Sequence, residues 1–133
     1  MIELERDKPS VMIVDDVPEI RALLSYMLKD LGFETVVEAS DGADALEKLK
    51  KDRTHLILCD HCMEKMSGLD LLSQLRNHPY LVDIPFIVVS AVSAAPVIAT
   101  ALDLGAEDYL LKPFAFENLK EKVIEVFRRR HDD

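Results

Sequence analysis

Cysteine is scarce in this sequence of 133 residues, which contains only Cys59 and Cys62. One C-x-x-C pair, without a second cysteine pair or a spaced histidine pair, is a weak zinc signal. Cys59 also lies inside an apolar run, where an unpaired cysteine behaves as a small hydrophobic residue. A structural or redox role for the pair is the less favoured alternative. Because no disulfide framework is possible, we expect a reducing compartment, the cytoplasm.

The sequence also lacks a membrane span and a basic surface. Residues 1–10 have no apolar core, so they do not form a signal peptide. The charge-free segment Ile84–Leu102 divides into a β-branched half and an alanine-rich half, which predicts a strand followed by a helix. Acidic residues outnumber basic residues 25 to 16, for a formal charge of -9. We therefore expect no direct contact with nucleic acid or membrane, whereas a cation such as Mg²⁺ is compatible with this charge.

Short apolar runs alternate with amphipathic segments along the whole chain. The runs predict five strands, at Val11–Val14, Thr35–Ala39, Leu56–Cys59, Phe86–Val89 and Tyr109–Leu111. Apolar residues at helical spacing predict five helices, near residues 18–31, 43–50, 69–75, 95–104 and 116–127. Connections that hold one helix each require parallel strands, so the pattern predicts a doubly wound α/β fold. We find no linker, and we expect residues 1–133 to form a single domain with a core at about residues 10–130.

Polar side chains stand where four of the predicted strands end. Asp15 and Asp16 follow the first strand, Asp60 follows the third, and Ser90 and Lys112 end the last two. Because the carboxyl ends of parallel strands share one edge, we expect these groups to converge. Three ionised carboxylates repel one another, and Mg²⁺ would relieve that repulsion. With the lysine and the hydroxyl, such a site suits a phosphoryl group on a carboxylate. The alternative is an internal salt-bridge cluster.

The chain resembles a response-regulator receiver domain (CheY-like) of two-component signalling. The resemblance is carried by V-M-I-V-D-D-V-P-E-I-R at residues 11–21, L-I-L-C-D-H-C-M-E-K-M-S-G at 56–68, I-V-V-S-A at 87–91 and G-A-E-D-Y-L-L-K-P-F at 105–114. These stretches have the order and spacing of the family and cover nearly the whole chain. The resemblance implies a flavodoxin-like parallel sheet of five strands in the order 2-1-3-4-5, with five helices.

The resemblance implies specific roles for the acidic residues. Asp60 would accept the phosphoryl group from a histidine kinase or a histidine phosphotransfer protein in a phosphorelay. Asp16 would bind Mg²⁺ directly and Asp15 mostly through water. Asp60 and the backbone carbonyl of Cys62 would be further ligands. The protein would then be a signalling domain rather than an enzyme, although it would promote its own phosphotransfer.

The remaining matches imply contact, switch and docking residues. Lys112 and Ser90 would contact the phosphoryl oxygens. Ser90 and Tyr109 would form the switch, with Tyr109 changing rotamer on activation, although an ordinary strand aromatic explains Tyr109 equally well by propensity. The kinase or phosphotransfer protein would dock near Ile20, Pro113 and Phe114.

Two residues near Asp60 depart from the family pattern. The usual motif is D-x-x-M-P-x-M-x-G, and Glu64 stands where the proline belongs. The loop is then less rigid and holds a fourth carboxylate, or Glu64 simply points into solvent. His61 follows the acceptor, and we interpret it as a solvated or packed loop residue rather than a nucleophile or a metal ligand. Neither departure removes a group that the chemistry requires.

The resemblance also predicts the lifetime of the phosphorylated form. In the family, the side chains two positions after the acceptor and two after the hydroxyl residue flank the attacking water. These are Cys62 and Val92 here. Val92 cannot orient water by hydrogen bonding and Cys62 does so weakly, so we expect slow self-dephosphorylation.

The predicted fourth helix, about Ala95–Leu104, carries one charge, Asp103. We expect one face to pack on the sheet, formed by Val97, Ile98, Ala101 and Leu102. The opposite face would expose alanine and threonine, an apolar strip typical of an interaction site, unless neighbouring elements cover it. With the last strand and the last helix, this face would form a homodimer or output surface.

Three other classes share parts of this pattern. A haloacid-dehalogenase-like phosphatase needs a second aspartate two residues after the nucleophile, where this chain has Cys62. A flavodoxin-like electron carrier needs a hydroxyl- and glycine-rich phosphate loop, where Asp15 and Asp16 would repel the phosphate. A degenerate receiver that only docks partners is less favoured, because every expected site residue is present.

Overall fold

The computed structural model of the protein describes residues 9–63 and 65–131, so Glu64 lies outside the described residues. Strands and helices alternate strictly, as β1 (Ser10–Val14), α1 (Pro18–Leu31), β2 (Thr35–Ala39), α2 (Gly42–Leu49), β3 (Leu56–Cys59), α3 (Gly68–Arg76), β4 (Phe86–Ser90), α4 (Ala95–Asp103), β5 (Asp108–Leu111) and α5 (Phe116–His131). All ten predicted elements are confirmed. The segment Ile84–Leu102 is a strand and a helix, and no helix in the described residues is long and apolar enough to cross a membrane.

The five strands form one parallel sheet in the order β2-β1-β3-β4-β5, which confirms the predicted topology. Every residue of β1, β3 and β4 is buried, because helices cover both faces of these central strands. The edge strand β2 is buried only at Ala39, which explains its weaker apolar signal in the sequence.

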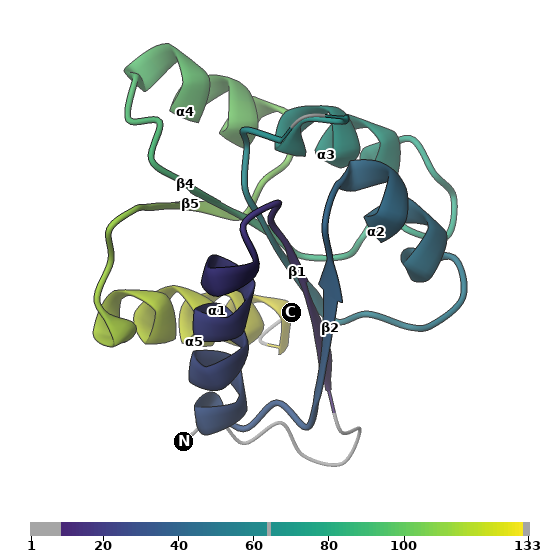
Figure 1. Cartoon of the computed structure of the whole chain (residues 1–133). Coiled ribbons are helices and arrows are strands. Elements are labelled where there is room, and N and C mark those ends of the chain that lie inside the picture. The colour runs from purple at the N-terminus through teal and green to yellow at the C-terminus, as the bar shows by residue number, and fades with distance from the viewer. Residues whose placement is uncertain (1–8, 64, 132–133) are drawn as a thin grey trace.

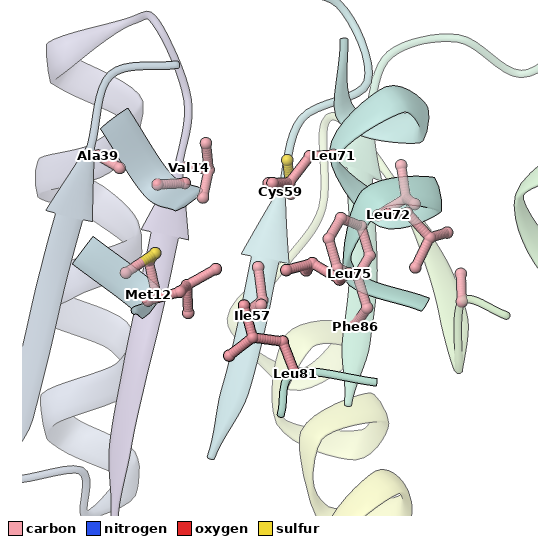
Figure 2. Packing of buried hydrophobic residues seen from close by; sticks show 14 of the residues in the cluster. Met12, Val14, Ala39, Ile57, Cys59, Leu71, Leu72, Leu75, Leu81 and Phe86 are labelled. Atoms are coloured by element: carbon pink, nitrogen blue, oxygen red, sulfur yellow. The ribbon is translucent and has the colours of Figure 1, made fainter. Parts of the chain in front are cut away.

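The helices divide between the two faces of the sheet. Figure 1 shows α1 and α5 on one face and α2, α3 and α4 on the other. Each face has its own buried cluster. On the α2–α3 face, strand residues such as Met12, Ile57 and Cys59 meet Leu71 and Leu75 of α3 (Figure 2). On the α1–α5 face, a second cluster includes residues of α1, such as Leu24 and Leu28, and residues of α5, such as Val123 and Val126.

Short-range signals define where the helices begin and end. Pro18 lies in the first turn of α1, and Gly32 ends that helix with a φ of 115° that glycine adopts without strain. The side chains of Asp41 and Ser67 accept hydrogen bonds from the amides of Asp44 and Asp70, which caps α2 and α3.

One prediction about α4 is wrong. We expected Leu102 to pack on the sheet, but it is 46% exposed, and Ala101 is the buried residue of this helix. Val97 and Ile98 are half-buried, as expected. The helix is therefore rotated so that Leu102 joins Ala99 and Thr100 on the exposed side.

Candidate functional site

Three carboxylates meet at the carboxyl edge of the sheet. Val14 and Cys59 are paired in neighbouring strands, and Asp15 and Asp60 are the residues that follow them. Asp15 and Asp60 are buried, whereas Asp16 is exposed. One oxygen from each of the three carboxylates lies within 4.8 Å of the others. Hard carboxylate oxygens at this spacing, one of them open to solvent, suit a hydrated divalent cation such as Mg²⁺.

Lys112 brings a positive charge from the end of β5. Its Nζ lies 2.9 Å from Asp15 Oδ2 and 3.5 Å from Asp60 Oδ2. Burial raises the pKa of the Asp60 carboxyl above its ordinary value, and the charge of Asp15 adds to this while Lys112 opposes it. Burial alone would lower the pKa of Lys112, but the hydrogen bond to Asp15 and the charge of Asp60 raise it. The lysine therefore stays charged beside both buried acids.

The loop after Asp60 closes tightly around that residue. The amide of Cys62 donates to Asp60 Oδ1 at 3.3 Å, and the amide of Gly68 donates to the His61 carbonyl at 2.9 Å. A Cβ on Gly68 would collide with the Asp60 carbonyl oxygen, so this position requires glycine. The loop therefore presents one carboxylate oxygen of Asp60 to Cys62 and the other to Lys112.

Ser90 and Tyr109 are joined through the loop that precedes α4. Ser90 is buried at the end of β4, and its hydroxyl oxygen accepts a hydrogen bond from the Val92 amide at 3.1 Å. The hydroxyl of Tyr109, which is 7% exposed, donates to the Val92 carbonyl at 2.8 Å. The two predicted switch residues are thus both hydrogen-bonded to the backbone of Val92, Ser90 at its amide and Tyr109 at its carbonyl.

The predicted docking residues differ in solvent exposure, and so do the two cysteines near Asp60. Ile20 and Phe114 are half-buried against the α1–α5 cluster, and Pro113 is exposed. Cys59 and Cys62 are both free, with Cys59 buried and Cys62 exposed.

His61 is half-buried in the loop that follows Asp60. Its Nδ1 is buried and makes no hydrogen bond within the described part of the chain. His61 is therefore a packed loop residue, as predicted.

One residue at the site was given no role from the sequence. Arg21 of α1 donates through Nη1 to the backbone carbonyl of Asp15 at 2.7 Å and through Nε to Glu38 Oε1 at 3.0 Å. In the sequence, Arg21 stands six residues after Asp15. That spacing alone does not show that α1 directs the Arg21 side chain toward the Asp15 carbonyl.

Comparison with known proteins identifies relatives of this chain. A model of the response regulator receiver domain matches residues 11–124. Chemotaxis protein CheY-3 of Vibrio cholerae serotype O1 is 36% identical over 119 residues, which are 90% of this chain and 92% of that protein. A probable transcriptional regulator, ycf27 of Porphyridium aerugineum, is 34% identical over 122 residues, or 92% of this chain and 49% of that longer protein.

Solved structures of similar proteins also superpose on this chain. The receiver domain of the Francisella response regulator 1452 superposes with a TM-score of 0.83 and 28% identity, covering 92% of this chain and 98% of that one. A chain of the CheX-CheY-BeF3-Mg+2 complex from Borrelia burgdorferi superposes with a TM-score of 0.84 and 26% identity over 90% of this chain and 89% of that one.

Proposed function

Because this chain belongs to the response regulator receiver domain family of two-component signalling, we propose that Asp60 is its phosphoacceptor. The observation that carries the proposal is the contact of Lys112 Nζ with both Asp15 and Asp60, inside a group of three carboxylates within 4.8 Å. A purely structural role does not explain this cluster, since burial disfavours the ionised form of Asp60 and so lowers the stability of the fold. We also propose that residues 1–133 form one receiver domain, located in the cytoplasm.

Asp15, Asp16, Asp60 and the backbone carbonyl of Cys62 would hold Mg²⁺. The set fits the ion, because it offers hard oxygen ligands and leaves Asp16 open to water. Bound Mg²⁺ would supply positive charge that offsets the negative charge of the phosphoryl oxygens.

The protein's own residues then perform the transfer. A carboxylate oxygen of Asp60 attacks the phosphorus of a phosphohistidine on a kinase or a phosphotransfer protein. The new O–P bond forms as the N–P bond breaks, and the released imidazole takes up a proton. Lys112 binds the phosphoryl oxygens, which draws it away from Asp15, and the Ser90 hydroxyl donates to a further oxygen.

Docking of the phosphodonor would use the side of the site formed by α1 and the loop after β5. Ile20, Pro113 and Phe114 lie there and combine exposed and half-buried apolar surface. Pro113 and Phe114 follow Lys112 in the chain, and Lys112 contacts Asp60, so a donor bound here would lie beside the acceptor.

Slow loss of the phosphoryl group and a switch at α4 complete the proposal. Val92 and Cys62 would flank the attacking water, and neither orients it well. When Ser90 turns toward the phosphoryl group, Val92 would lose the acceptor of its amide, and Tyr109 would change rotamer and release the Val92 carbonyl. The loop would then shift and present α4, β5 and α5 to an output partner or to a second copy of the chain.

The direct test is incubation with acetyl phosphate and Mg²⁺, followed by intact-mass measurement. The wild type should gain one phosphoryl group, and the gain should require Mg²⁺. Asp60→Asn should gain none, and full labelling of this variant would overturn the assignment.

A further inference from the structure

We infer that Arg21 is a positioning residue for the acidic site. Arg21 holds the Asp15–Asp16 peptide so that the Asp16 carboxylate faces the metal position. This inference rests on the proposed function, since it concerns the same Mg²⁺ site. It assigns to α1 a part in metal binding, beyond its place beside the docking surface.

The guanidinium of Arg21 is fixed by two partners in different directions. Nη1 donates to the Asp15 carbonyl at 2.7 Å, and Nε donates to the Glu38 carboxylate of β2 at 3.0 Å. The Arg21 side chain is only 18% exposed, against 44% for Glu38. Two bonds to a planar group set its orientation as well as its position, which a flexible lysine ammonium does not do.

Asp15 is bonded at each of its polar groups. Its amide donates to the Ala39 carbonyl at 3.2 Å, and its two carboxylate oxygens accept from the Val17 amide and from Lys112, each at 2.9 Å. The carbonyl is the remaining group, and Arg21 occupies it. These bonds together fix the plane of the peptide that joins Asp15 to Asp16.

Asp16 depends on that peptide for its direction. It is exposed, and no hydrogen bond to its side chain is found within residues 9–63 and 65–131. A ligand without bonds of its own is oriented by its backbone, and groups that orient metal ligands typically contribute about 10- to 100-fold to metal affinity. Loss of Arg21 should therefore weaken Mg²⁺ binding although Arg21 touches no metal.

Charge and geometry predict opposite effects at this position. The positive charge of Arg21 repels a nearby cation, so an effect of charge alone would make Mg²⁺ bind more tightly when the charge is removed. Positioning predicts weaker binding when the two-armed contact is removed, whether or not the charge is kept. Arg21→Ala removes both contact and charge, and Arg21→Lys keeps the charge but replaces the planar guanidinium with a single nitrogen that has no fixed orientation.

The test is calorimetric titration of the full chain with MgCl₂, for the wild type, Arg21→Ala, Arg21→Lys and Glu38→Gln. The expected dissociation constants are about tenfold weaker for both Arg21 variants. Glu38→Gln is the matched control, because its amide oxygen still accepts from Nε and the Asp15 contact is kept, so it should stay within about twofold of the wild type. Thermal unfolding in EDTA reports whether each variant is folded, independently of the metal.

The possible outcomes separate this inference from the proposed function. If the wild type binds no Mg²⁺, the proposed metal site fails and the inference fails with it. If the wild type binds Mg²⁺ and Arg21→Ala binds it equally or more tightly, the proposed function stands and the positioning role is wrong. If Arg21→Lys matches the wild type while Arg21→Ala is weaker, the side chain acts without its two-armed geometry, and the inference is again overturned.

Discussion

Asp60 is a carboxylate whose ionised form is disfavoured by folding. Burial raises the pKa of this carboxyl, Asp15 raises it further, and Lys112 offsets only part of the increase. A raised pKa means that the folded state holds the proton more tightly than the unfolded state. The contribution of Asp60 to stability therefore falls as the pH rises from the unfolded-state pKa, about 3.9, through the folded-state pKa.

We accordingly expect Asp60→Asn to raise the free energy of unfolding at neutral pH in EDTA. The gain should shrink on acidification and vanish where Asp60 is protonated in both states, below about pH 3.9. Urea denaturation at several pH values measures this, with Asp103→Asn on the exposed side of α4 as the control. An Asp60→Asn variant that is less stable than the wild type at neutral pH would contradict the proposal that the ionised Asp60 carboxylate destabilises the folded state.

Cys62 and Val92 are the residues that we propose flank the attacking water. Cys62→Asn and Val92→Gln each place a carboxamide where it can orient water, so both should shorten the lifetime of the phosphorylated form, by about tenfold if one well-placed hydrogen bond is gained. Val92→Leu, which adds no hydrogen-bonding group, is the control. The decay is measured by intact mass after removal of acetyl phosphate, and unchanged decay in both carboxamide variants would count against the account.

The sequence predicted most site residues because their position follows from topology. Asp15, Asp60 and Lys112 follow strands of one parallel sheet, so all three had to lie at its carboxyl edge. Arg21 was missed because its contact depends on the angle at which α1 leaves the loop after Asp16. That angle is set by packing against the sheet, which no local motif shows.

At the scale of elements, α4 is held differently at its two ends. Beyond its C-terminal end, Arg76 of α3 donates to the carbonyls of Val82, Ile84 and Gly105 and pairs with Glu107 at 3.1 Å. At its N-terminal end, the preceding loop is held by the hydroxyls of Ser90 and Tyr109. A change at the proposed phosphorylation site should therefore move the N-terminal end of α4 and leave the C-terminal end in place.

Arg76→Met should lower the free energy of unfolding by about 2–3 kcal/mol, because it leaves partly buried carbonyls and the Glu107 carboxylate without this donor. Arg129→Met is the matched control. It breaks an exposed 3.4 Å pair with Glu125, which should change stability by less than about 0.5 kcal/mol. Equal stability of the two variants in urea denaturation would show that the Arg76 contacts do not anchor this end of α4.

The exposed side of α4 is the proposed output surface. Its helical spacing was clear from the sequence, but its rotation was not, because Val97, Ile98, Ala101 and Leu102 offered two overlapping apolar faces. The structure buries Ala101 and exposes Leu102, so Leu102→Glu tests the surface without disturbing the core.

We expect beryllium fluoride with Mg²⁺ to increase self-association or binding to an output partner, and Leu102→Glu to abolish the increase. Light scattering and partner titration measure this. Ile98→Glu is less informative, because Ile98 packs against the buried cluster on that face of the sheet. If beryllium fluoride changes neither property of the wild type, the proposed switch surface is wrong.

For the whole molecule, the alternation of elements was sufficient to predict a parallel α/β fold. Each connection between the short runs holds one helix, so every strand had to point the same way. The strand order came from the resemblance, since spacing alone does not say which neighbour β1 takes. The structure places β1 between β2 and β3, and that position brings Asp15 beside Asp60.

The most direct measurement is to identify the phosphorylated residue in the wild-type chain. The chain is first phosphorylated with acetyl phosphate and Mg²⁺. Borohydride then reduces an aspartyl phosphate to homoserine with release of phosphate, and tandem mass spectrometry locates the homoserine in the sequence. We predict homoserine at position 60 and none when Mg²⁺ is replaced by EDTA. Homoserine at position 15 or 16, or a phosphoryl group retained on another residue, would contradict the assignment of Asp60 as the phosphoacceptor.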